Sequence, residues 1–217
     1  MSVEVMLSLL FQGFFVSLLI FFVTLLGSLP LGVLVALARM SSFKPLAVIT
    51  RVYISVMRGT PLMLQILAIF FGPFFILGVS LSTEWKIIAC LIAFVINYAA
   101  YFGEIYRSGI QSIPQGQWEA AEVLGYTKSQ TFMRVILPQV IKRIVPSLAN
   151  EVITLVKDTS LAFVIGIAEL MSQAKALSAS QASMIPFVMA GLMYWLFNMI
   201  VETLLNKLEI KLDYYHE

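Results

Sequence analysis

Two carboxylates, Glu151 and Asp158, stand seven residues apart in a largely apolar part of the chain. That spacing places both side chains on one face of a helix, about 10 Å apart along its axis. A charged side chain at the centre of a membrane costs about 2.5–3.5 kcal/mol on insertion scales, so each one requires a partner or a function. For Asp158 two interpretations remain open: a structural pair with Arg58 or Lys157, or contact with the cationic group of a bound molecule.

Other polar side chains interrupt the apolar segments that precede this pair. Gln65 follows residues 58–61, Arg-Gly-Thr-Pro, in which the proline removes a backbone donor and disfavours helix at the residue before it. Irregular backbone at membrane depth is tolerated where it is buried in protein or lines a cavity. Asn97 and Tyr98 lie further along, and such residues usually face other helices. Helix packing and a polar-lined path are therefore both open for these side chains.

The longest polar segment, residues 107–146, predicts a small folded unit outside the apolar helices. Its central part, residues 119–138, reads EAAEVLGYTKSQTFMRVILP. Amphipathic helices of this kind either pack on the chain's own apolar domain or insert into a groove of another protein. Glu119 with Ala120 and Ala121 favours the second interpretation, because two alanines allow close backbone approach and a carboxylate can pair with a basic partner residue.

Start and stop signals divide this segment into two short helices. Residues 117–124 carry two glutamates in the first turns, where the helix dipole favours negative charge, and Gly125 suits a left-handed C-terminal stop. Thr127, with Gln130 three residues later, forms the capping-box pattern of the second helix. Pro138 is then expected to end that helix.

Composition places these features in a membrane protein. The chain has 217 residues, of which 60% are hydrophobic and 12% charged, and its mean hydropathy is +0.93. A soluble domain carries about 25% charged residues, so this chain has too little polar surface to cover a globule. The net charge of +2 gives no indication of nucleic-acid binding. The N-terminus lacks the basic region of a secretory signal, so the first apolar stretch is expected to remain in the mature protein.

Apolar stretches predict an all-α membrane protein with five transmembrane helices. A bilayer core about 30 Å thick needs about 20 apolar residues in helical form. Pro30 is the expected kink of the first helix. Ser28, Gly32 and Ala36 form a stripe of small residues on that helix, which permits close approach of another helix. The expected spans are residues 5–38, 46–77, 87–106, 148–170 and 184–205.

Lysine and arginine set the orientation of these helices, since cytoplasmic loops carry an excess of them. The loop after the first span, the long polar segment and the C-terminal tail all carry lysine or arginine, while the opposite side has little beyond Lys86 and Lys175. We therefore expect the N-terminus outside and the C-terminus in the cytoplasm. Residues 171–183 are expected to be a loop or an interfacial helix. The whole chain, residues 1–217, is expected to form one transmembrane domain that includes the cytoplasmic segment 107–146.

Several reaction classes are disfavoured by the residues present. Cys90, the sole cysteine, lies in an apolar run, and His216, the sole histidine, lies in the tail, so metal and Cys–His chemistry have no residues to use. A phosphate-binding loop needs GxxxxGK[ST], whereas residues 125–129, Gly-Tyr-Thr-Lys-Ser, lack its spacing and its second glycine. The chain is therefore expected neither to be an enzyme nor to hydrolyse ATP.

A spaced pattern runs through the polar segment: EAA, three residues, Gly, nine residues, then V-x-L-P. This pattern resembles the EAA loop of ABC importer permeases, which has isoleucine where this chain has valine. Residues 58–65, 97–104 and 157–161 resemble the polar amino-acid importer permeases in particular, and the likeness covers nearly the whole chain. The residues of the pattern are Glu119, Ala120, Ala121, Gly125, Val135, Leu137 and Pro138.

The resemblance implies the architecture of a type I ABC importer permease in a bacterial cell membrane. Two such subunits, identical or homologous, would form the translocation path together. Two ABC ATPase subunits would bind ATP and Mg on the cytoplasmic side, and each would receive one EAA loop in a groove. A binding protein outside the cell would deliver a polar or charged amino acid, and this chain itself would need no cofactor.

Within that architecture, a set of polar residues is expected to approach the transported amino acid. They share polarity on helices that otherwise exclude it, and each such residue in a membrane requires a reason. An alternative from another class stays open: an ion-coupled secondary amino-acid transporter that uses the membrane carboxylates as proton sites, although no inverted repeat is visible. The residues of the set are Gln65, Asn97, Tyr98, Glu151 and Asp158.

Overall fold

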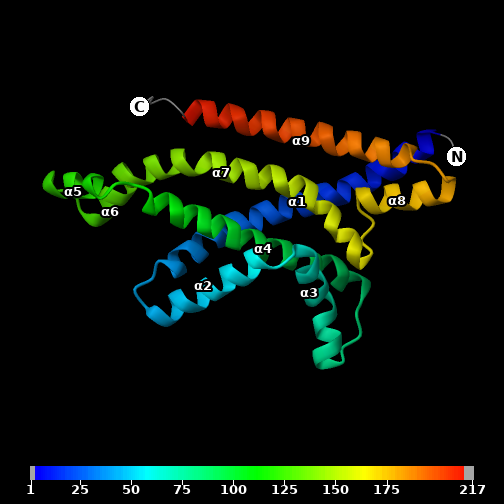
Figure 1. Cartoon of the computed structure of the whole chain (residues 1–217), viewed down its shortest axis with the longest axis horizontal. Coiled ribbons are helices and arrows are strands. Elements are labelled where there is room, and N and C mark those ends of the chain that lie inside the picture. The colour runs from blue at the N-terminus through cyan, green and yellow to red at the C-terminus, as the bar shows by residue number, and fades with distance from the viewer. Residues whose placement is uncertain (1–2, 213–217) are drawn as a thin grey trace.

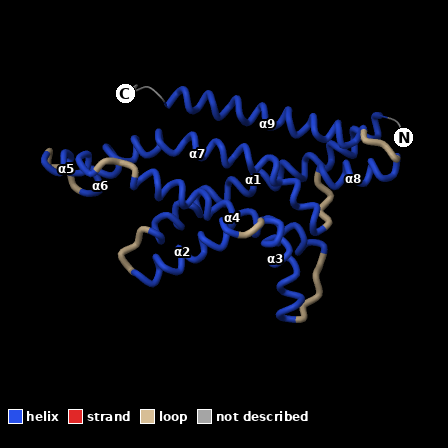
Figure 2. Tube along the Cα trace, viewed as in Figure 1, coloured by secondary structure: helices blue, strands red, loops and turns tan. Residues whose placement is uncertain are grey.

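The computed structural model describes residues 3–212, and it is helical with no strand in that range, as the sequence predicts (Figure 1, Figure 2). His216 lies outside the described residues, and Cys90 is fully buried. In chain order the helices are α1 (Val3–Arg39), α2 (Lys44–Gly59), α3 (Leu62–Leu77), α4 (Thr83–Gln111), α5 (Gln115–Val123), α6 (Lys128–Thr131), the π-helical turn η1 (Phe132–Ile136), α7 (Leu137–Asp158), the 3₁₀ helix η2 (Thr159–Ile165), α8 (Leu170–Gln181) and α9 (Ile185–Leu212).

α1 packs on α4 through the predicted stripe of small residues. Ser28, Gly32 and Ala36 are all buried. A Cβ added at Gly32 would lie 2.8 Å from the Cβ of Phe102 and 3.2 Å from the backbone nitrogen of Gly103. A Cβ added at Gly103 would in turn lie 3.2 Å from the carbonyl oxygen of Gly32. The two glycines therefore set how closely these helices approach.

The expected second span, residues 46–77, is not one helix. α2 and α3 are separate helices, and the chain bends by 111° between them. Thr60 and Pro61 are both extended at the break, because proline lacks a backbone donor and disfavours helix in the residue before it. The sequence indicated irregular backbone at residues 58–61, but the expected span 46–77 did not anticipate two helices that meet at such a large angle. In contrast, α1 continues through Pro30 without interruption.

The expected fourth span, residues 148–170, is also interrupted. α7 ends at Asp158, η2 continues to Ile165, and Gly166 then adopts a φ of 73°. A residue in the left-handed region ends a helix, and glycine reaches that region without a Cβ clash. The chain turns there into α8, so the segment expected as a loop or interfacial helix, 171–183, is mostly helical.

Length and apolar composition identify three helices of the described range that can cross a membrane, α1, α4 and α9. The bent pair α2–α3 supplies a fourth pass if its two helices count as one span. α7 does not qualify by this measure, because it carries lysine, arginine and acidic residues along its length. Figure 1 shows the long helices side by side, with α5 and α6 at the end opposite α8.

Side chains from α1, α3, α4, α7 and η2 form the main core. Phe94, Tyr98 and Phe102 of α4 are at most 2% exposed. Ile66 of α3 and Leu155 of α7 are fully buried against them. Between helices in lipid, van der Waals packing rather than exclusion of water stabilises such a core. α4 is therefore the central helix, and its polar residues lie among several neighbours.

Candidate functional site: coupling loop and polar path

The first short helix of the polar segment ends as the sequence predicts. Gly125 follows α5 with a φ of 80°. Its amide donates a 2.9 Å hydrogen bond to the Glu122 carbonyl. The Tyr126 amide donates a 3.1 Å bond to the Ala121 carbonyl. Together these bonds form a Schellman motif, which satisfies the last carbonyls of the helix.

The second helix begins as predicted but does not end at Pro138. Thr127 accepts a hydrogen bond from the Gln130 amide at 3.4 Å, and its own amide donates to the Gln130 side chain at 2.9 Å, which completes the capping box. The chain then passes through η1 directly into α7. The Leu137 amide bonds the Phe132 carbonyl, one residue further back than in an α-helix. Pro138 lies in the first turn of α7, where a missing donor is tolerated, so the expected stop is wrong.

The tip of this loop exposes apolar side chains at one end of the molecule (Figure 1). Val123 is 88% exposed and Leu124 is 76% exposed. Glu119 and Ala120 are also exposed, whereas Ala121 is buried within the loop. Of the two alanines, only Ala120 is therefore open to a partner. Contiguous apolar side chains on a polar loop are typical of a surface that another protein covers.

The base of the loop is packed against α4 and α7. Ile136 is fully buried, and the rings of Trp118 and Phe132 lie 6.5 Å apart. Arg143 of α7 donates a 2.5 Å hydrogen bond to the Ser112 carbonyl at the end of α4. A displacement of the loop would therefore be transmitted to both long helices.

Gln65 and Asn97 meet at the break between α2 and α3. The Asn97 amide donates to Gln65 Oε1 at 2.9 Å and to the Met57 carbonyl at 3.0 Å. Gln65 Nε2 donates to the carbonyls of Met57 and Thr60 at 3.0 and 3.1 Å. Carbonyls at the end of a helix lack partners within the helix. The two buried amides therefore satisfy the end of α2 and tie it to α4.

Tyr98 and Asp158 meet between α4 and the end of α7. The Tyr98 hydroxyl donates a 2.7 Å hydrogen bond to Oδ2 of Asp158. Tyr98 is 2% exposed, whereas Asp158 is half-buried. The hydrogen-bond partner of Asp158 is therefore a phenol on α4, which neither interpretation of this acid had included.

Glu151 lies two turns before Asp158 on the same face of α7 and is also half-buried. The Arg58 guanidinium lies 5.2 Å from the centre of the Tyr101 ring. Side chains from α2, α4 and α7 thus bring acidic, basic and phenolic groups together.

A second acid on α4 has its own partner. Glu104 accepts a 2.9 Å hydrogen bond from Nε of Arg107, one turn later, and the two form an ion pair. Pairs at this spacing are common on single helices. Glu104 is therefore accounted for by its own helix and is not part of the polar path.

Sequence reasoning missed one buried acid, Glu169. Its carboxylate is fully buried and accepts hydrogen bonds from the amides of Met171 and Ser172 at 2.7 and 2.6 Å. The Tyr194 hydroxyl donates a third bond at 3.0 Å. Glutamate is not among the preferred N-cap residues, and the expected fourth span ran across this position. No local pattern therefore singled it out.

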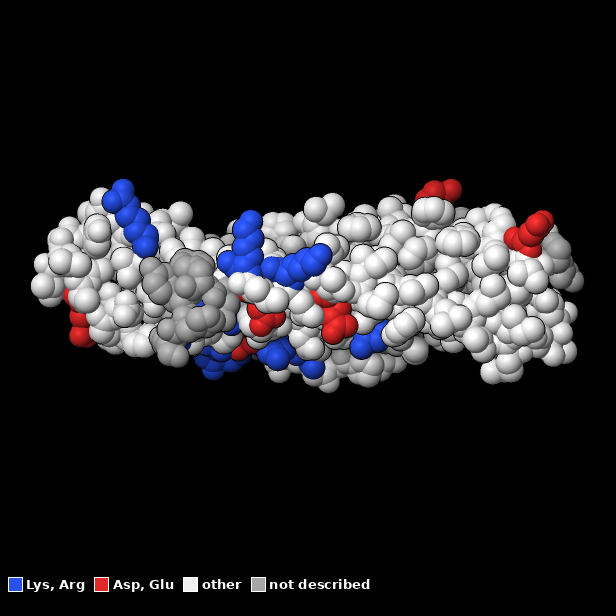
Figure 3. Space-filling model, turned by 90° about the horizontal axis from the view of Figure 1, so that it is seen from above, with Lys and Arg blue, Asp and Glu red and all other residues white. Residues whose placement is uncertain are grey.

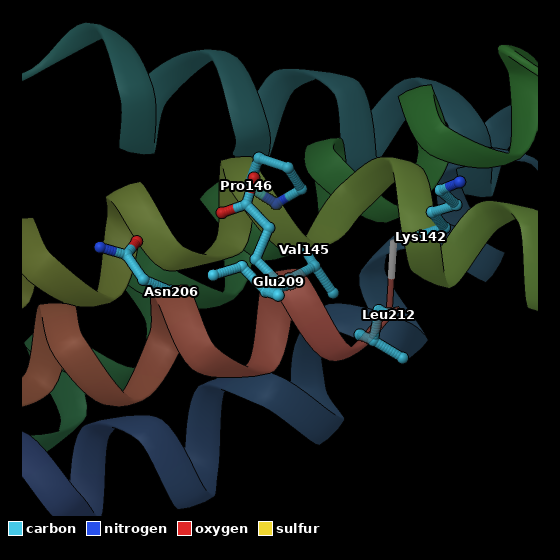
Figure 4. A pocket seen from close by; sticks show the side chains of 7 residues that line it. Lys142, Val145, Pro146, Asn206, Glu209 and Leu212 are labelled. Carbon is cyan, nitrogen blue, oxygen red and sulfur yellow. The ribbon is translucent and has the colours of Figure 1, made fainter. Parts of the chain in front are cut away.

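A cavity of about 480 Å³ lies between the C-terminal half of α9 and the first half of α7 (Figure 4). None of the polar residues described above lines it, so it is not part of the polar path. Its lining residues are Lys142, Val145, Pro146, Asn206, Glu209, Ile210 and Leu212.

Comparison with known proteins gives consistent matches along the chain. The family "Binding-protein-dependent transport system inner membrane component" matches residues 28–214. The arginine transport system permease protein ArtQ of Bacillus subtilis (strain 168) is 37% identical over 202 residues, which cover 93% of this chain and 91% of ArtQ. The L-cystine transport system permease protein TcyB of the same organism is 39% identical over 188 residues, 85% of this chain and 78% of TcyB. A putative glutamine transport system permease protein, GlnP of Rickettsia bellii (strain RML369-C), is 32% identical over 202 residues, 93% of this chain and 91% of GlnP.

Solved structures agree with these relatives. An amino acid ABC transporter crystallised with histidines superposes with a TM-score of 0.85 at 34% identity, covering 94% of each chain. The inward-facing MetNI methionine ABC transporter superposes with a TM-score of 0.73 at 18% identity, covering 98% of this chain and 99% of the other, and shows the shared fold alone. The chain therefore belongs to the family of inner membrane components of binding-protein-dependent transport systems, and it is a multi-pass permease subunit of an ABC transporter in the cell membrane.

Proposed function

We propose that this permease serves an ATP-driven importer for polar or charged amino acids. The names of its relatives support the substrate class, since ArtQ is named for arginine, TcyB for L-cystine and GlnP for glutamine. The family is described as dependent on a binding protein. Relatives and a solved structure named as amino-acid ABC transporters support ATP rather than an ion gradient as the energy source, so the ion-coupled alternative is not favoured.

The proposed topology has five passes, with the N-terminus outside and the C-terminus in the cytoplasm. In Figure 1, the chain runs toward the end that carries α5 and α6 along α1, α4 and α9. It runs in the opposite direction along α7 and along the pair α2–α3, which connects α1 to α4. In Figure 3, Lys and Arg side chains lie toward the end that carries α5 and α6 and over the middle, and none is visible at the end that carries α8. Basic residues mark the cytoplasmic side, which supports a cytoplasmic position for residues 107–146.

The exposed tip of residues 115–136 is the observation that carries the proposal. Val123 and Leu124 are exposed at the C-terminal end of α5, a helix that lies at one end of the molecule (Figure 1), and Glu119 is exposed in the same loop. We infer that each of two ABC ATPase subunits receives one such loop in a groove. ATP and Mg would bind to those subunits, and movement of the grooves would reach α4 and α7 through the packed base at Ile136.

The proposed contact for the amino acid lies around Tyr98, Glu151 and Asp158. Tyr98 fixes one oxygen of Asp158, and Glu151 adds a second carboxylate from the same helix. Carboxylates so placed can bind an ammonium group or a cationic side chain through charge-assisted hydrogen bonds. Gln65 and Asn97 remain in the proposed set, and we propose that they shape the wall of the path, a role that fits their bonds to the end of α2.

The other partners follow from the same assignment. A second permease subunit, identical or homologous, would complete the path, and a binding protein outside the cell would deliver the amino acid. Lipid would contact the apolar faces of α1 and α9, on which Leu26 and Leu204 are 75% and 61% exposed. No nucleic acid is expected to bind.

Reconstitution tests the proposal directly. The chain would be co-expressed with a candidate ABC ATPase from the same organism and placed in proteoliposomes with the candidate binding protein. The substrate would be chosen by measuring direct binding of each of the twenty amino acids to the binding protein. We expect uptake of a polar or charged amino acid that requires ATP on the side of the membrane that carries the ATPase. Uptake driven by an ion gradient in the absence of ATP would contradict the proposal.

A further inference from the structure

Arg58 brings a positive charge to the break between α2 and α3. It lies in the last turn of α2, its side chain is exposed, and its guanidinium faces the Tyr101 ring at 5.2 Å. An arginine side chain carries five N–H donors in a planar fork. Within residues 3–212 this guanidinium forms neither an ion pair nor a hydrogen bond, so the described chain supplies a ring for its face and no acceptor for its donors.

The level of Arg58 along the helices matters for its function. The preceding residue, Met57, accepts a 3.0 Å hydrogen bond from Asn97, which lies at the midpoint of α4. Arg58 is therefore far from both ends of this spanning helix. A basic anchor at the membrane surface, an ordinary role of arginine in membrane proteins, does not fit that level. Charged side chains at such depth face the interior of a bundle or a water-filled cavity and mark the route of a substrate or ion.

Two tyrosines of α4 separate this cation from the acids of α7. The ring centres of Tyr98 and Tyr101 are 6.1 Å apart, and the Tyr98 hydroxyl bonds Oδ2 of Asp158 at 2.7 Å. α4 and α7 run in opposite directions (Figure 1), so Glu151, two turns before Asp158, lies on the Tyr101 side of that bond. Within the described chain, Arg58 pairs with neither acid. Opposite charges thus flank the tyrosine pair without neutralising each other.

The unused groups on the two sides match the two charges of an α-amino acid. Tyr98 engages Oδ2 of Asp158, and Oδ1 accepts no hydrogen bond from residues 3–212. A carboxylate accepts charge-assisted hydrogen bonds from an ammonium group, and a guanidinium fork binds a carboxylate through two parallel bonds. An α-amino acid carries its ammonium and carboxylate groups on one carbon, so a single molecule can meet both sides. A molecule without the carboxylate would leave Arg58 unpaired.

We infer that Arg58 is a specificity-determining residue that binds the α-carboxylate of the transported amino acid, while Asp158 and Glu151 face its ammonium group. The inference rests on the proposed function and narrows it: the ligand must carry a free α-carboxylate, whatever its side chain. Selection for the amino-acid backbone then takes place within the permease as well as in the binding protein.

Paired probes that differ in the carboxylate alone test the inference. The probes are L-arginine with L-argininamide and L-glutamine with L-glutamine amide, at about pH 6, where the α-amino groups are protonated. Equilibrium binding is measured on the permease co-purified with a candidate ABC ATPase, without a binding protein, so that the selectivity of that protein does not enter.

Arg58→Gln should weaken binding of the free amino acid about 10- to 100-fold, the loss expected for a hydrogen bond between charged groups, and should change binding of the amide less than about twofold. The preference for the acid over the amide is then lost. Arg51→Gln is the matched control, because Arg51 is an exposed arginine on the same helix two turns earlier, and it should keep the preference. Asp158→Asn should weaken acid and amide alike, because both retain the ammonium group.

The outcomes separate this inference from the proposed function. Equal weakening of acid and amide by Arg58→Gln, or no effect on either, overturns the inference. Normal binding to Asp158→Asn, together with a lost preference in Arg58→Gln, supports the role of Arg58 and counts against the proposed role of Asp158. Absence of binding of both amino acids to the unsubstituted complex counts against both. Arg58→Lys decides if Arg58→Gln fails to accumulate: it keeps the charge but not the fork, so its loss of affinity should be smaller and again confined to the free acid.

Discussion

The Tyr98 hydroxyl and the Asp158 carboxylate are joined by a 2.7 Å hydrogen bond across 60 residues of sequence. The phenol is almost fully buried, whereas the acid is half-exposed. A rigid donor on the central helix α4 thus sets the direction of a carboxylate at the point where α7 gives way to η2. The position of Asp158 is therefore set by a hydrogen bond from a buried side chain rather than by a surface ion pair.

Asp158→Asn should lower ATP-driven uptake by about tenfold or more, since a hydrogen bond to a charged group contributes about 1.5–3 kcal/mol. The amide keeps the size of the side chain but removes the charge that would meet an ammonium group. Initial uptake rates and binding-protein-stimulated ATPase activity in proteoliposomes are the measurements. Glu202→Gln, on an exposed face of α9, is the control. Normal values for Asp158→Asn would remove this residue from the path.

Glu119→Lys and Gly125→Asp should each abolish co-purification of the ATPase while the permease remains folded. A Cβ at Gly125 meets no atom within 4 Å, and the φ of 80° costs about 1 kcal/mol for a side chain that tolerates it. The isolated chain should therefore accept Gly125→Asp, so a failure would come from the partner's groove. Glu84→Lys, at the far end of α4, reverses a charge elsewhere and should leave the complex intact. Normal recovery of the ATPase with both loop variants would refute the coupling role.

Gly103→Ala should destabilise the permease by about 1–3 kcal/mol through overpacking. The added methyl would lie 2.6 Å from Cγ1 of Val35 and 3.2 Å from the Gly32 carbonyl. Gly191→Ala is the control, because its added Cβ meets no atom within 4 Å and alanine favours helix over glycine. The melting temperature of each variant is measured by thermal unfolding of the detergent-solubilised protein. Equal melting temperatures for the two variants would show that α1 and α4 are not in close contact.

Gln65→Leu and Asn97→Leu should each cost about 1–3 kcal/mol, because Gln65→Leu leaves the Thr60 carbonyl without its side-chain donor and Asn97→Leu removes one of the two donors to the Met57 carbonyl together with the bond between the two amides. The two side chains share the Met57 carbonyl and bond each other. Their effects should therefore be non-additive by about 0.5–3 kcal/mol in a double-mutant cycle of unfolding free energies. Strict additivity would mean that the pair does not act as one unit at the break.

Features that depend on a few neighbouring residues were predictable from the sequence. The stop at Gly125 and the capping box of Thr127 with Gln130 use bonds within one or two turns, and both are found as expected. The small-residue stripe at Gly32 is buried for a similar reason, since its spacing alone defines a helix face. The all-helical fold follows from composition in the same way.

Features that depend on distant contacts were not predictable. Pro61 indicated irregular backbone at residues 58–61, but the division into two separate helices is also stabilised by Asn97, which bonds the end of α2 from another helix. Pro138 suggested an end, but a π turn before it lets the chain run on into α7. Glu169 is satisfied by Tyr194 and by backbone amides, a combination that no spacing rule encodes.

The central claim is that the exposed loop tip lies in the groove of a separate ATPase, and site-directed crosslinking tests it most directly. Single cysteines would replace Leu124, 76% exposed at the tip, or Leu77, 72% exposed at the end of α3, in a Cys90→Ala background. A bifunctional thiol reagent applied to membranes should join the Leu124→Cys chain to the ATPase subunit and should leave the Leu77→Cys chain uncoupled from it. No ATPase adduct from Leu124→Cys, or an adduct from Leu77→Cys alone, would contradict the account.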